Sequence, residues 1–299
     1  MKKTPILFVC AAMMLTGCSG ATATIKDKDE TIMTIGDTKY TKGDEYELLK
    51  ISTGSDLTME LVKQAIYKQE VKVTKEMKEK AQKQVNDYKE NMENFDEQIH
   101  SLGYKNSKQY MNKVLIPSLQ ASELTEKYFT DAKKDIQKTY KPSKARIIQC
   151  ENKATAKKAL KALKNGTDTE EVAQQYMVDS AKYSGKETLV TTKTTDLSTR
   201  LINTLSKTKK SGVIDEVFTN ESSGTTYAYV AVLVSNTYKA IKDDVYTALS
   251  SDDDVTKACL VYYLKKYNFE VHDQDVFNNL KANNPEYLVS RPDLSESDD

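Results

Sequence analysis

The chain has 299 residues, with 44 basic and 44 acidic side chains, and its mean hydropathy is −0.62. This length is enough for two domains, and a content of 29% charged and 38% hydrophobic residues indicates modest cores with well solvated surfaces. The balanced charge argues against nucleic acid as a partner, because phosphate binding requires a concentrated basic face.

The N-terminus has the three parts of a secretory signal peptide. Lys2 and Lys3 are positive, residues 6–15 form an apolar run, and small residues precede Cys18. The run is too short for a transmembrane helix, which takes about twenty residues. Residues 15–18 (LTGC) resemble the lipobox of bacterial lipoproteins, in which the cysteine receives a diacylglyceryl group and the chain is cut before it. We therefore expect removal of residues 1–17, a lipid on Cys18 and a location at the extracytoplasmic face of the cell membrane; the alternative is an ordinary signal peptide followed by an unmodified cysteine.

Residues 18–30 are small and polar and predict a flexible tether. Apolar and polar residues then alternate over 31–35, Gly36-Asp37 predicts a turn, and 38–40 returns, which together predict a short hairpin. Thr41 and Asp44 have the spacing of a capping box. They predict a helix from there to about Lys50.

The pattern from 57 to 140 is helical almost throughout. The first expected helix has one apolar face made of Leu61, Ala65, Ile66 and Tyr67. Thr74 is expected to cap a second helix over 75–92, whose apolar positions are Met77, Ala81, Val85 and Tyr88. A third helix is expected over 107–129, with Tyr110, Val114, Leu115 and Leu119 inward. Pro117 should distort it, and a last helix over 131–140 should stop at Pro142.

After Pro142 the pattern becomes that of a small α+β domain over 141–237. Strands are expected at 144–150, 188–192, 213–218 and 227–234, and helices at 154–163, 169–177 and 198–205. Helices return at 240–249, 255–267 and 273–280, and 283–299 is expected to be a disordered tail. Because the C-terminal flank is too short for a domain, we expect 31–140 and 238–282 to form one helical domain with the α+β domain inserted.

This layout resembles the PrsA family of extracellular foldases, which have a lipobox, a helical chaperone domain built from both ends of the chain and a parvulin-type prolyl isomerase domain between them. The resemblance covers nearly the whole mature chain and rests on residues 32–41, 151–166, 212–215 and 269–277. It implies an α+β fold class, a membrane-anchored foldase and, as partners, unfolded secreted proteins and the lipid bilayer. It implies no cofactor and no metal.

The isomerase positions depart from the family pattern. Where parvulins have a histidine in the first strand this chain has Arg146, and where they have one in the last strand it has Val230. The acidic or thiol position after the second helix is matched by Asp179, which we expect to pair with Arg146. The resemblance then implies isomerase activity that is weak or absent, since a guanidinium and an isopropyl group replace the hydrogen-bonding histidines.

The remaining candidate residues favour structural roles. Cys150 and Cys259 lie in apolar surroundings and favour buried free thiols, with a disulfide as the alternative. His100 and His272 lack a ligand partner at i+3 or i+4, which argues against a metal site. Asp252–254 lacks the spaced oxygens of a calcium loop and is expected to cap the helix that follows.

The rival function is a solute-binding lipoprotein that serves a transporter. Such proteins need two α/β lobes with repeated strand–helix alternation, and the polar helices from 57 to 140 fit that pattern poorly. An oligomer formed through the helical domain is compatible with the sequence but nothing in it argues for one.

Overall fold

The structure is a computed structural model, and it describes residues 24–222 and 224–291. The expected signal peptide (1–17) and the expected lipid site at Cys18 lie outside the described residues. The described chain forms two compact units, which we describe one at a time. Unit 1 consists of residues 24–69 and 260–291, and unit 2 of residues 70–259. No described helix is both long enough and apolar enough to cross a membrane.

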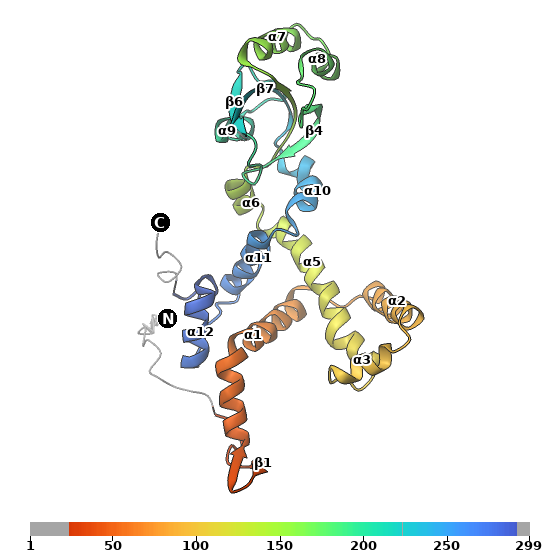
Figure 1. The fold of residues 1–299 in the computed structure, drawn as a ribbon, viewed down its shortest axis with the longest axis vertical. Helices are drawn as coiled ribbons and strands as arrows, with labels where there is room; N and C mark the ends of the chain where they lie inside the picture. Colours follow the sequence, from red (N-terminus) through yellow and green to blue (C-terminus); the bar gives the residue numbers. More distant parts are fainter. Residues whose placement is uncertain (1–23, 223, 292–299) are drawn as a thin grey trace, which may run out of the picture. The chain divides into compact units, whose positions relative to one another are not determined.

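Unit 1 begins with the expected hairpin, made of β1 (Thr31–Ile35) and β2 (Thr38–Thr41) (Figure 1). Gly36 in its turn has φ +57°, a conformation that costs glycine little. The capping box is present as predicted, because Thr41 N donates to Asp44 Oδ2 at 2.7 Å and Asp44 N donates to Thr41 Oγ1 at 3.2 Å. The hairpin therefore leads directly into the helix α1.

α1 runs from Lys42 to Glu70 as one continuous helix, so the expected break after Lys50 is wrong. Ser52 Oγ donates to the carbonyl oxygen of Leu48 at 2.8 Å, and Ser55 Oγ donates to Asn279 Oδ1 at 2.5 Å. The Ser52 hydroxyl thus bonds back to the helix's own backbone, and the Ser55 hydroxyl bonds to a side chain of the C-terminal segment. The expected apolar face is only partly correct, since Ile66 is buried while Leu61 is 69% exposed.

The C-terminal segment of the chain supplies the partner of α1 within unit 1. It consists of the end of α11 (Asp253–Lys266), of α12 (Gln274–Asn283) and of a 3-10 turn (Pro285–Tyr287). Lys50 Nζ lies 2.6 Å from Asp275 Oδ2 and 3.4 Å from Asp273 Oδ2. The expectation of disorder from 283 onward is wrong for 283–291, because a 3-10 turn forms there and the Leu288 side chain is buried.

Helices form the first part of unit 2. They are α2 (Lys75–Asn91), α3 (Phe95–Ser101), α4 (Ser107–Tyr110), α5 (Ile116–Asp131) and α6 (Lys133–Tyr140). Thr74 caps α2 as expected, accepting from Met77 N at 3.2 Å. Pro117 distorts the third expected helix, because a π-helical turn at Met111–Leu115 stands where the proline removes a backbone donor. α3, with Phe95 and Ile99 buried, is an element that the sequence pattern did not predict.

The second part of unit 2 is built on a five-stranded antiparallel sheet with the order β4-β3-β7-β5 and β6 paired with β7. The strands are β3 (Ser143–Cys150), β4 (Ser184–Val190), β5 (Gly212–Val213), β6 (Phe218–Ser222) and β7 (Thr225–Ser235). The single strand expected at 213–218 is two strands. The chain turns between them, where Glu216 N donates to the carbonyl oxygen of Ile214 at 2.8 Å.

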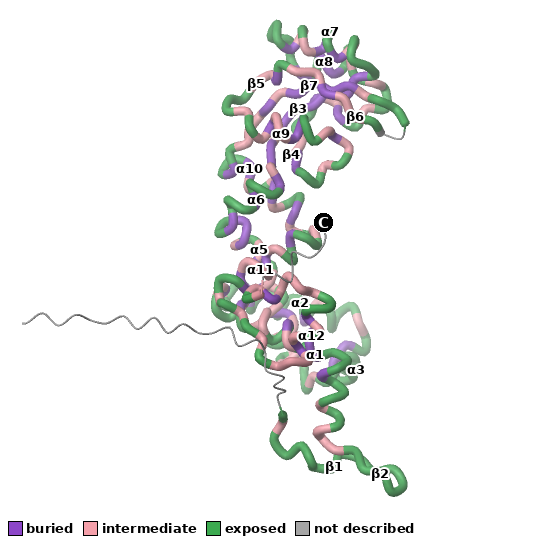
Figure 2. Tube along the Cα trace, turned by 90° about the vertical axis from the view of Figure 1, so that its left-hand side faces the viewer, coloured by how far each residue is buried: buried purple, intermediate pink, exposed green. Residues whose placement is uncertain are grey.

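Helices cover both faces of this sheet. α7 (Lys153–Lys164) and α8 (Thr169–Tyr176) cover one face, and α9 (Thr199–Lys207) covers the other; α10 (Tyr238–Leu249) follows β7 (Figure 1). Successive residues of β7 alternate between the two cores, with Val230 toward α7 and α8 and Tyr229 toward α9. Figure 2 shows the buried strands between exposed helix surfaces.

Candidate functional site

Arg146, at the first isomerase position, is held by two carboxylates. It lies on β3, where its Nη2 is 3.1 Å from Glu187 Oε1 on β4 and its Nη1 is 3.5 Å from Glu170 Oε1 on α8. The expected pair with Asp179 is wrong. β4 begins at Ser184, which places Glu187 directly opposite Arg146 in the strand pairing, whereas Asp179 lies exposed beyond the end of α8.

Val230, at the last isomerase position, is completely buried. It lies on β7 opposite Ile148, two positions along the ladder from the pair of Arg146 with Val232. Positions 146 and 230 therefore lie on neighbouring strands, two ladder positions apart. The isopropyl group packs in the core beneath α7 and α8 and has no atom that could hydrogen-bond to an amide. Position 230 therefore offers no polar group on this face of the sheet.

A hydrogen-bonded group on the other face of the sheet was not predicted. Tyr183 Oη donates to Asp196 Oδ1 at 2.8 Å, and Lys182 Nζ lies 2.6 Å from Asp196 Oδ2. Burial opposes ionisation of Asp196, but the hydrogen bonds from Lys182 and Tyr183 outweigh it and lower its pKa. Burial raises the pKa of Tyr183. These contacts hold the loop before α9, and the Asp196 carboxylate is fully used in them. No sequence motif predicts the group.

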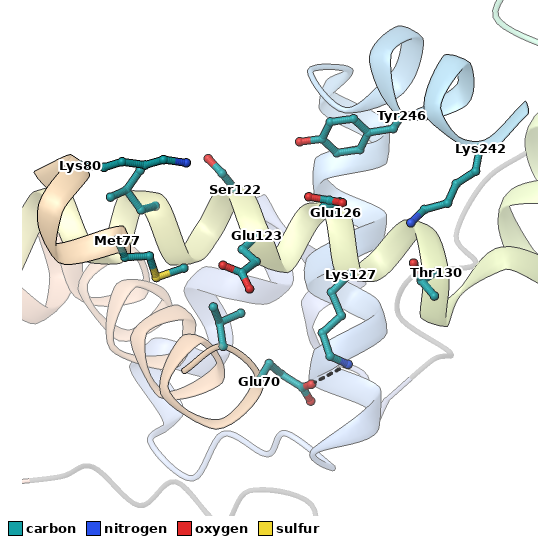
Figure 3. A pocket seen from close by; sticks show the side chains of 12 residues that line it. Glu70, Met77, Lys80, Ser122, Glu123, Glu126, Lys127, Thr130, Lys242 and Tyr246 are labelled. Carbon is teal, nitrogen blue, oxygen red and sulfur yellow. Dashed lines mark ion pairs between the residues drawn. The ribbon is translucent and has the colours of Figure 1, made fainter. Parts of the chain in front are cut away.

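A cleft of unit 2 lies among its helices (Figure 3). Its volume is about 530 Å³, and α2, α5, α10 and the last residue of α1 form its walls. The apolar lining consists of Val71, Met77, Leu119 and Tyr246. The charged lining consists of Glu70, Glu123, Glu126, Lys80, Lys127 and Lys242, with Ser122 and Thr130 between them. The two signs are balanced, so the cleft has no preference for an anion or a cation as a whole.

Contacts across long stretches of sequence set the shape of this cleft. Gln120 Nε2 on α5 donates to the carbonyl oxygen of Val71 at 2.7 Å, which fixes the connection from α1 to α2. Tyr238 Oη on α10 donates to the carbonyl oxygen of Phe129 at 2.7 Å, and the rings of Phe129 and Tyr246 meet edge to face at 5.3 Å. Within unit 2, α5 before the α+β domain and α10 after it are therefore in contact.

An ion pair closes one end of the cleft. Glu70 Oε2, whose side chain is 5% exposed, lies 3.1 Å from Lys127 Nζ, and Lys127 also pairs with Asp131 (Figure 3 shows the first pair). The hydrogen bond to Asp131 and then that to Glu70 raise the pKa of Lys127. With its apolar side chains and charges of both signs, the cleft suits a short peptide segment of mixed character rather than one small ion.

The other candidate residues have structural surroundings. Cys150 and Cys259 are buried free thiols, as favoured from the sequence, and burial raises their pKa values to about 11 and about 12. His100, in the last turn of α3, has its Nε2 3.0 Å from the carbonyl oxygen of Lys105. His272 is exposed and stands just before the cap of α12. Within 24–222 and 224–291, no three His, Cys, Asp or Glu residues are grouped to hold a metal ion.

The expected cap at residues 252–254 is present. Asp252 Oδ1 accepts from Asp254 N at 3.0 Å and from Val255 N at 3.2 Å, which starts α11. Asp252 and Asp254 also pair with Lys193. These carboxylates are therefore used in capping and ion pairing.

Comparison with solved structures identifies the fold. The chain matches the crystal structure of a peptidylprolyl isomerase (PrsA) from Bacillus cereus with 22% identity and a TM-score of 0.50, over 85% of this chain and 98% of that chain. It also matches the foldase protein PrsA of Streptococcus pneumoniae with 18% identity and a TM-score of 0.38, over 84% of this chain and 98% of that chain. The match to PrsA of Bacillus subtilis has 20% identity and a TM-score of 0.36, over 85% of this chain and 99% of that chain. No family model and no curated protein matches the sequence. The B. cereus match confirms the expected fold, which is α+β with a helical domain and an inserted parvulin-like domain.

Proposed function

We propose that this chain, which has the fold of the PrsA structures, is a foldase that assists secreted proteins after their translocation. The observation that carries the proposal is the match to the B. cereus isomerase along 98% of that chain. The helical cleft with its apolar and charged lining supports the chaperone part of the proposal, because unfolded segments present both kinds of side chain. Binding there is weak and broad and needs no ATP.

The chaperone role is tested by aggregation of a denatured client protein. A soluble form of the protein, from Ser19 onward, is mixed with the client at equimolar concentration, and light scattering is followed. We expect aggregation to be suppressed. Unchanged scattering, with the chain itself folded by circular dichroism, would count against the foldase.

The isomerase part of the proposal is that catalysis is weak or absent. Prolyl isomerisation crosses a barrier of about 20 kcal/mol, and the catalyst must favour the twisted amide in its cleft. Arg146 is engaged by Glu170 and Glu187, and Val230 is buried and apolar, so neither position offers the free polar group that the family pattern uses. A proline-limited refolding assay tests this; strong acceleration by this chain would overturn it.

The location is a separate part of the proposal. It rests on the lipobox-like residues 15–18. In the full precursor, Cys18→Ala should leave residues 1–17 uncut and should abolish labelling of the protein by a radioactive fatty acid. Mass spectrometry of the mature N-terminus shows whether the cysteine carries a diacylglyceryl group.

The rival function, a solute-binding lipoprotein, lacks support from the fold. Such proteins place their ligand between two lobes with parallel strands. Both sheets in the described part of the chain are antiparallel, one with two strands and one with five.

A further inference from the structure

The β1–β2 hairpin exposes its apolar side chains to solvent. Of the thirteen large apolar side chains that are exposed in the described residues, nine lie between positions 32 and 61, and the hairpin carries Ile32, Met33, Ile35 and Tyr40. Ile35 is 71% exposed and Met33 58%. A grouped apolar surface of this kind marks an interaction site. Figure 2 shows both strands as exposed.

The strand register places Met33, Ile35 and Tyr40 on one face, whereas Ile32 lies at the irregularity between Thr31 and Met33. Met33 lies opposite Tyr40 and Ile35 lies opposite Thr38, and side chains directly opposite each other share a face. Thr34 lies opposite Lys39 on the other face. The first face, made of Met33, Ile35, Thr38 and Tyr40, is the apolar hairpin face. The second face carries a charge.

The hairpin is held firmly at its base. Lys42 N donates to the carbonyl oxygen of Glu30 at 2.8 Å, and Gly43 N donates to that of Lys28 at 2.7 Å. A side chain at Gly43 would meet this same oxygen of Lys28 at 3.0 Å, so the approach is close. Residues 28–30 are thus fixed to the start of α1, unlike the flexible tether expected up to residue 30. The hairpin has a defined direction relative to α1 (Figure 1).

The length of chain before Lys28 limits where the hairpin can be. Cys18 precedes Lys28 by ten residues, and a fully extended chain of that length spans about 36 Å at most. If Cys18 carries the lipid, as the proposed function holds, the hairpin cannot leave the neighbourhood of the bilayer. Tethering of this kind converts a weak affinity into a well populated contact, since the surface is always at high effective concentration.

We propose that the apolar hairpin face rests on the lipid bilayer and orients unit 1 above it. Ile and Met side chains gain by leaving water, and a tyrosine suits the boundary between acyl chains and headgroups. Because a charged side chain is costly inside the bilayer, Asp37 in the turn keeps the tip of the hairpin out of the acyl chains. The hairpin therefore lies along the interface. The face alone is too small to hold a second copy of the chain, because it has four residues whereas a stable protein interface uses about 20–30 on each side.

The absence of tryptophan from the chain allows a sharp test. Three full-length variants, lipidated and reconstituted in phosphatidylcholine–phosphatidylglycerol vesicles, each carry one tryptophan. Ile35→Trp probes the apolar hairpin face, Thr34→Trp probes the charged face, and Leu102→Trp replaces a side chain of similar exposure (68%) that follows α3. We expect lipids with brominated acyl chains to quench Ile35→Trp severalfold more than the other two, with a blue-shifted emission.

Each other outcome overturns the inference in a distinguishable way. Equal quenching of the three variants, on a chain that is acylated and floats with the vesicles, refutes hairpin docking and leaves the anchor intact. A chain that is neither acylated nor floats refutes the anchor in the proposed function, and docking falls with it. A blue shift of Ile35→Trp without vesicles, together with a dimer mass by light scattering, assigns the face to a second copy of the chain.

Discussion

Arg146 and Glu187 face each other across the antiparallel strands β3 and β4, with Nη2 and Oε1 3.1 Å apart. Glu170 approaches the same guanidinium from α8. The basic residue at the first isomerase position is therefore part of a bridge between two strands and a helix. The charge of its guanidinium group is therefore paired with two carboxylates in the absence of any substrate.

We expect Arg146→Met to change little. The side chain is 30% exposed, and partly solvated pairs contribute about 1 kcal/mol or less, so denaturant unfolding should shift by no more than that. Refolding rates of a proline-limited client should be the same with wild type, Arg146→Met and the conservative Arg146→Lys. A loss of catalysed refolding in Arg146→Met that Arg146→Lys restores would assign this residue a catalytic role.

The buried lysine of unit 1 should matter more. Lys50 is 7% exposed in its side chain and pairs with Asp275 and with Asp273, which caps α12. Lys50→Met leaves the largely buried Asp273 with an uncompensated charge, and breaking a buried pair in this way costs about 3 kcal/mol or more. Hydrogen exchange of the amides of α12 should quicken accordingly. Lys42→Met, which removes an exposed lysine at the start of the same helix, is the control and should leave that exchange unchanged.

The same pair predicts a dependence on pH. The hydrogen bond from Lys50 to Asp275 raises the pKa of the lysine above its usual 10.5 despite the opposing effect of burial. The stabilisation is complete below the pKa of the unfolded chain and is lost as the pH rises through the higher folded value. α12 should therefore open more readily above about pH 10.5 in wild type. Lys50→Met should show no such step, and an identical step in both proteins would contradict the assignment.

Filling the helical cleft should impair the chaperone. Ser122 lines the cleft and is exposed on α5, so Ser122→Trp places a ring in it without disturbing the core. Ser118→Trp, on an exposed position of the same helix that does not line the cleft, is the matched control. We expect Ser122→Trp to lose most of the suppression of client aggregation and Ser118→Trp to keep it. Equal suppression by both variants would place client binding elsewhere.

The two thiols should be inert in the folded protein. Burial raises the pKa of Cys150 to about 11 and of Cys259 to about 12, so at pH 8 on the order of one thiol in a thousand, or fewer, is a thiolate. In the soluble form from Ser19 onward, a thiol reagent should label both slowly before denaturation and completely after it. Rapid labelling of one in the folded state would show that its segment opens.

Local signals in the sequence predicted local structure well. The turn at Gly36-Asp37, the capping box of Thr41 with Asp44 and the cap at Thr74 depend on neighbours within a few residues, and all are present. The predictions fail where the helix bounds or the ion-pair partner depend on residues that are distant in the sequence. α1 continues through 52–55, where Ser55 binds Asn279, 224 residues further along the chain. The partner of Arg146 is Glu187 because the start of β4 sets the strand register.

The candidate site divides in the same way. The strands that carry positions 146 and 230 could be predicted from the sequence, because both segments are apolar and rich in β-branched residues. The cleft could not be predicted, because its lining comes from four helices whose packing depends on contacts such as Gln120 with Val71 and Tyr238 with Phe129. The local sequence around Gln120 and Tyr238 gives no sign of the distant backbone oxygen to which each side chain donates.

The pairing of α1 with α12 also has a consequence for biogenesis. A chain delivered from its N-terminus presents residues 42–69 first, but the acidic partners of Lys50 arrive only after residues 70–259 have followed. Unit 1 therefore closes late, across a long loop whose ordering costs entropy until that last segment emerges. Unit 2 is contiguous in the sequence and can fold before unit 1 closes. A chain truncated before Asp273 would lack α12, so α1 would lose this packing partner.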